Sequence, residues 1–126
     1  MNPNYQLGLL CLAHLLISAD GVVDEQELKA LGIIRKKEKI SDNVYVKFEK
    51  VIEGKKEREL FQKGIELINL CTDEEKLKVF AMLYKLSEVD GRVHVKEIRL
   101  LLYSIKLTGV EFDDVVTKAT SLPSLL

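Results

Sequence analysis

The chain has 126 residues, of which 47% are hydrophobic and 31% are charged. This length and composition are typical of a globular protein with a core of its own, and we expect a single domain over residues 1–126. With 19 Lys and Arg against 20 Asp and Glu, the net charge of −1 gives no reason to expect a nucleic-acid partner. Cys11 and Cys71 lie in apolar runs, so both should be buried, reduced thiols.

Apolar residues recur with a helical period along the chain, and no stretch alternates polar and apolar residues as a strand would. We therefore predict an all-α fold of about seven helices. In chain order we expect helices over residues 3–19, 25–37, 44–52, 57–70, 73–89 and 95–108, and a short one led by Asp113 and Asp114.

The first helix should be the most deeply buried, because residues 7–19 are apolar on nearly every side. The run is shorter than the stretch of about 20 residues that spans a bilayer. Its one histidine, His14, reads as a core residue rather than a metal ligand. No Lys or Arg precedes Lys29, so we expect no secretory signal and a cytoplasmic protein.

Several local signals mark where helices begin and end. Thr72 and Glu75 have the spacing of a capping box, and Asp24 and Glu27 repeat it. Ser41 is typical of the residue that precedes a helix. Glycines at 21, 54, 91 and 109 should close the helices before them. The mixed charge runs 35–39 and 55–58 are expected to be solvated helix faces.

One pattern occurs twice. Asp20 and Asp90 each precede a glycine, and a glutamate follows each glycine six residues later, at Glu27 and Glu97. The two aspartates lie 70 residues apart, and so do the two glutamates. The matched positions are Leu16, Asp20, Gly21, Val23, Glu27, Leu28 and Leu31 with Leu86, Asp90, Gly91, Val93, Glu97, Ile98 and Leu101. The repeat predicts two pseudo-symmetric halves, about 5–54 and 72–118, with the first and fifth helices as a central antiparallel pair.

Each copy places carboxylates around a turn, which makes the turns candidate sites for a divalent cation such as calcium or magnesium. Asp20, Asp24 and Glu27 form the stronger candidate site. Asp90 and Glu97 form a weaker one, because Arg92 and Lys96 lie beside them in sequence.

Three other interpretations remain open. Asp20 can bond the turn backbone and Glu27 can cap the next helix, with no metal involved. The turn also resembles the second half of an EF-hand loop, which suggests a calcium sensor, although Leu16 and Leu86 replace the opening carboxylate. A hydrolase is disfavoured, because no pairing of a nucleophile with a base is visible.

The repeated motif Ala19-Asp20-Gly21-Val22-Val23-Asp24-x-x-Glu27, with its second copy Val89-Asp90-Gly91-Arg92-Val93-x-x-x-Glu97, resembles the TerB-like family of tellurite-resistance and stress-response proteins. The resemblance implies an all-helical domain of two pseudo-symmetric halves. It also implies that the acidic motif residues, here Asp20, Asp24, Glu27, Asp90 and Glu97, are the ones to bind a metal cation.

From the resemblance and the residues together, we expect a non-enzymatic binding or scaffold module in a tellurite or metal-related stress response. Its partner should be a protein, and contact with a membrane surface would be peripheral rather than integral. The second copy departs from the family pattern at Arg92, His94 and Lys96.

Overall fold

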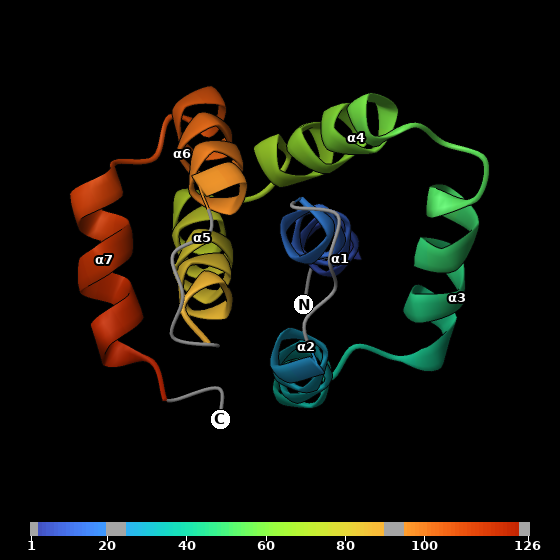
Figure 1. The fold of residues 1–126 in the computed structure, drawn as a ribbon, viewed down its shortest axis with the longest axis horizontal. Helices are drawn as coiled ribbons and strands as arrows, with labels where there is room; N and C mark the ends of the chain where they lie inside the picture. The colour runs from blue at the N-terminus through green and yellow to red at the C-terminus, as the bar shows by residue number, and fades with distance from the viewer. Residues whose placement is uncertain (1–2, 20–24, 90–94, 124–126) are drawn as a thin grey trace.

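The computed structural model describes residues 3–19, 25–89 and 95–123, and within these ranges it contains seven helices and no strand (Figure 1). This confirms the all-α prediction. The helices are α1 (Pro3–Ser18), α2 (Glu25–Lys37), α3 (Asp42–Ile52), α4 (Glu57–Asn69), α5 (Asp73–Ser87), α6 (Val95–Thr108) and α7 (Phe112–Ser121).

Helix α1 lies at the centre of the fold, where it contacts α2, α3, α4, α5 and α6 (Figure 1). Most of its side chains are buried, as expected for a helix that is apolar on nearly every side. Cys11 on this helix and Cys71 after α4 are buried free thiols, which confirms the prediction for both. His14 is only partly buried and packs edge-on against Phe48 of α3, and burial lowers the pKa of its imidazole.

The repeat predicts that the first and fifth helices, α1 and α5, pack against each other, and the two helices do make contact. The most extensive neighbour of α1 is, however, α4. Gly8 and Gly64 allow this close approach. A Cβ at Gly8 would lie 2.6 Å from Cδ1 of Ile68, and a Cβ at Gly64 would lie 2.9 Å from Cδ2 of Leu12. A side chain at either position would push the two helices apart.

Several helices begin and end at the capping residues that the sequence predicts. Thr72 and Glu75 form a complete capping box: the Glu75 amide donates to Oγ1 of Thr72 at 3.1 Å, and the Thr72 amide donates to Oε1 of Glu75 at 2.9 Å. Ser41 caps α3 by accepting from the Val44 amide at 3.3 Å. Gly54 and Gly109 have positive φ angles of 71° and 74° just after α3 and α6. The Asp24–Glu27 box and the turn glycines 21 and 91 involve residues outside those that the structure describes.

The prediction that the run 35–39 is a solvated face is wrong for Glu38, whose exposed fraction is 8%. Its Oε1 accepts a hydrogen bond of 2.7 Å from the Tyr5 hydroxyl and lies 3.2 Å from Nζ of Lys78. Gln6 of α1 donates to the Glu38 carbonyl at 3.1 Å. Burial, followed by the bond to Glu38, raises the pKa of Tyr5. Groups from α1 and α5 thus hold the residue just after α2 in place.

Among the residues described, no helix is long and apolar enough to cross a membrane.

Candidate functional site

The two glutamates of the repeated motif are both buried, although each lies in the first turn of its helix. Glu27 of α2 is 1% exposed and Glu97 of α6 is 0% exposed. Removing a carboxylate from water is costly unless polar or charged groups compensate it. Equal burial at positions 70 residues apart is therefore a shared structural feature of the two copies, and the sequence repeat did not by itself predict it.

The remaining predicted metal ligands, Asp20, Asp24 and Asp90, lie outside the residues that the structure describes, as does His94. Within residues 3–19, 25–89 and 95–123, no group of three His, Cys, Asp or Glu side chains is arranged to hold a metal ion. The proposed cation site thus has only Glu27, or in the second copy Glu97, among the residues whose placement is known.

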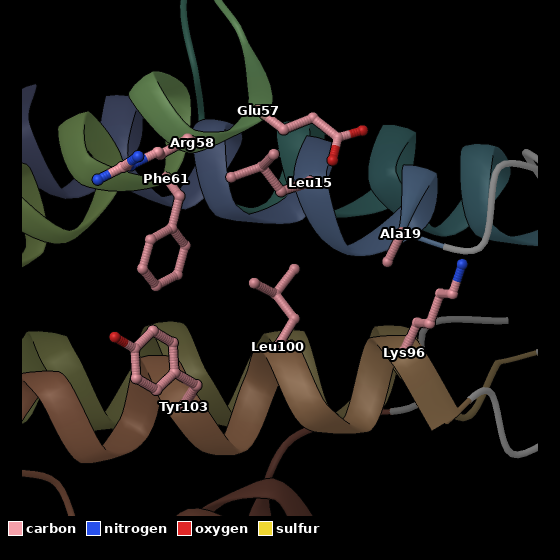
Figure 2. A pocket seen from close by; sticks show the side chains of 8 residues that line it. All are labelled: Leu15, Ala19, Glu57, Arg58, Phe61, Lys96, Leu100 and Tyr103. Carbon is pink, nitrogen blue, oxygen red and sulfur yellow. The ribbon is translucent and has the colours of Figure 1, made fainter.

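A groove of about 340 Å³ lies where α6 meets α1 and α4. We call it the α4–α6 groove. Figure 2 shows Leu15 and Leu100 facing each other across it, with Phe61 and Tyr103 together toward one end. The two aromatic rings are stacked, with centroids 5.6 Å apart and planes inclined by 12°. Its residues are Leu15, Ala19, Glu57, Arg58, Phe61, Lys96, Leu100 and Tyr103.

Helix α6 also carries other exposed apolar side chains outside the groove. Tyr103 is 55% exposed, and Val95, Leu102 and Leu107 of the same helix are also exposed. Aromatic residues such as Tyr103 are enriched at binding surfaces. The groove volume also falls in the range of about 300–1,000 Å³ typical of ligand sites.

Charged side chains mark the two ends of the groove. Arg58 of α4 lies at the end with Phe61, and Lys96 of α6 lies at the other end, with its amine pointing toward Ala19 (Figure 2). Glu57 is the one carboxylate among the lining residues. The groove therefore combines an apolar middle with a small excess of positive charge.

The position of Lys96 changes the electrostatic argument made from the sequence. From its place in the sequence, Lys96 is expected to weaken cation binding only at the second acidic turn. The first turn has no basic residue before Lys29. In the fold, Lys96 faces the carboxyl-terminal end of α1, which directly precedes the first turn. A cation is favourable at a helix C-terminus, so this ammonium group from the other half suits its place at the end of α1.

No family model, curated protein or solved structure matches the chain.

Proposed function

We propose that the protein is a non-enzymatic TerB-like binding or scaffold module in a tellurite or metal-related stress response, and that it binds a protein partner in the α4–α6 groove. The observation that carries the proposal is the groove itself, with Leu15 and Leu100 in its middle and an exposed aromatic residue, Tyr103, at one end. Exposed aromatic and arginine side chains around an apolar pocket are typical of the residues that dominate binding energies.

The charges at the groove ends specify the kind of partner. Arg58 and Lys96 outnumber Glu57 among the lining residues, so a complementary segment would carry negative charge. We infer a partner segment that inserts an apolar side chain between Leu15 and Leu100 and places a carboxylate next to it. The apolar side chain would supply affinity, and the carboxylate would fix its direction along the groove.

The pattern of helix contacts supports two pseudo-symmetric halves with α1 and α5 as a central pair. Helix α1 contacts α2 and α3, and α5 contacts α6 and α7. Across the halves, α1 contacts α6 and α2 contacts α5. Two of the matched pairs are also buried alike, Leu16 with Leu86 and Glu27 with Glu97. This arrangement is the one that the TerB-like resemblance implies.

We expect deletion of the gene to increase sensitivity to tellurite in the organism of origin, and the wild-type gene to restore tolerance. The double variant Arg58→Glu/Tyr103→Ser should not restore it, because loss of such interface residues weakens partner binding by about tenfold or more. Growth across a tellurite series is the measurement.

Val46→Ser is the matched control for this experiment, because Val46 is an exposed apolar residue on α3, away from the groove. It should restore tolerance fully. Thermal melts must show both variants folded. A deletion strain as tolerant as its parent would argue against the stress role, and full rescue by the double variant would argue against the groove.

The second candidate function is cation binding at the first acidic turn, through Asp20, Asp24 and Glu27. The burial of Glu27 favours it, because a buried side chain holds its carboxylate in a fixed place at the start of α2. The same burial suits a glutamate that only caps the turn. Titration separates these two roles.

For a cation at the first turn, we expect weak binding, with a Kd of about 10⁻⁴ M for calcium or magnesium, because Leu16 replaces the opening carboxylate of an EF-hand loop. Asp20→Asn should abolish binding, and its matched control Asp90→Asn should change it little. Lys96→Gln should tighten binding by removing a positive charge from the end of α1, the helix that precedes the turn. NMR titration of each variant measures this.

Loss of binding in Asp90→Asn would place the site in the second half, or divide it between the halves. No binding by the wild-type protein would leave the turn with a capping role. Calcium-dependent opening of the α4–α6 groove would support the calcium-sensor alternative.

A further inference from the structure

A second cavity, of about 190 Å³, lies between the end of α2, α5 and the segment that follows α7. Its apolar part is formed by Ile34 of α2, Met82 of α5 and Leu122, all of which belong to the core or pack against it. The volume is below the range of about 300–1,000 Å³ typical of sites for drug-sized ligands. The space therefore suits a small ligand, of the size of a short alkyl chain.

Three lysines line the same cavity: Lys37 from α2, and Lys78 and Lys85 from α5. Glu38 is the one carboxylate among the lining residues. Its Oε1 already accepts from the Tyr5 hydroxyl and lies 3.2 Å from Nζ of Lys78. This contact fixes the Lys78 ammonium at the cavity wall, and the lining as a whole carries a net positive charge.

We propose that this cavity, which we call the lysine-rimmed cavity, binds a single-chain alkyl carboxylate. The tail would fill the apolar part of the cavity, where it is removed from water, and the carboxylate would accept charge-assisted hydrogen bonds from the Lys85 and Lys78 ammonium groups. The flexible side chain of Met82 can adapt to the tail, and the lysine stems extend the apolar wall. A carboxylate would balance the net positive charge of the lining, and a neutral headgroup would not.

The test is an NMR titration of the isotope-labelled full chain with octanoate below its critical micelle concentration. We expect saturable shifts of the Ile34 and Met82 methyl signals. Lys85→Gln should weaken binding about threefold, and the double variant Lys37→Gln/Lys85→Gln about tenfold, since each is a rim charge. Lys36→Gln is the matched control and should change nothing, because Lys36 lines a different depression with Arg35 and Lys39.

Several results would overturn the proposal. One is the absence of any saturable shift with octanoate. Another is binding of octan-1-ol as tight as that of octanoate, which would mean that the lysines do not select a carboxylate. Equal weakening in Lys36→Gln would show only a general charge effect. Shifts of the same size at exposed Leu70 would show adsorption to apolar surface. None of these results bears on the α4–α6 groove, which shares no lining residue with this cavity.

Discussion

Truncating Leu86 to alanine is expected to lower the free energy of unfolding by about 2–5 kcal/mol, and truncating Leu16 should have an effect of the same size. The two leucines occupy matched positions of the repeat, on α5 and α1, with exposed fractions of 0% and 1%. Each alanine would lose apolar burial and leave a cavity in a core that the two halves share. Urea denaturation followed by circular dichroism measures the change.

Leu28→Ala is the control for both variants, because Leu28 is 50% exposed on α2. Its effect should stay within about 0.5 kcal/mol. If one core variant cost less than about 1 kcal/mol while the other unfolded the protein, the matched positions would not play equivalent roles in the two halves.

The second large effect is expected for Gly8→Leu, which should lower the free energy of unfolding by about 1–3 kcal/mol. Even the Cβ of a new side chain would lie 2.6 Å from Cδ1 of Ile68 and 3.3 Å from Cβ of Leu67. Leucine would therefore force α1 away from α4, its most extensive neighbour. Thermal and urea denaturation report the loss.

The same substitution at Gly32 provides a control of opposite sign. Gly32 lies inside α2, and a Cβ there would meet nothing within 4 Å. Gly32→Leu should therefore raise the free energy of unfolding by up to about 0.8 kcal/mol, because leucine favours helix more than glycine does. A Gly8→Leu protein as stable as the wild type would contradict the close approach of α1 and α4.

The helix spans were predictable from the sequence because their signals are local. Thr72 and Glu75 cap α5 through atoms only a few residues apart, and Gly54 and Gly109 follow helix ends with a positive φ. The apolar character of α1 likewise predicted its central place. The hydrophobic pattern and the interactions between residues close in sequence are sufficient to predict such features.

Features that depend on distant parts of the chain could not be predicted in this way. Glu38 stands in a basic, polar run, and only the approach of Tyr5 and Lys78 explains its burial. The α4–α6 groove needs three helices together before Leu15, Phe61 and Leu100 become neighbours. Lys96 was assigned to the second turn by its sequence position, yet it faces the end of α1.

Site-specific photo-crosslinking in cells tests the partner-binding role of the α4–α6 groove most directly. A benzophenone amino acid replaces Tyr103, which is 55% exposed in the groove, or Phe112, which is 37% exposed on α7. We predict one discrete adduct from position 103 and none from 112. The crosslinked peptide should carry an apolar residue beside an Asp or Glu, and Arg58→Glu with Lys96→Glu should remove the adduct. No adduct from position 103, equal adducts from both positions, or a crosslinked peptide without acidic residues would contradict the proposed role of the groove.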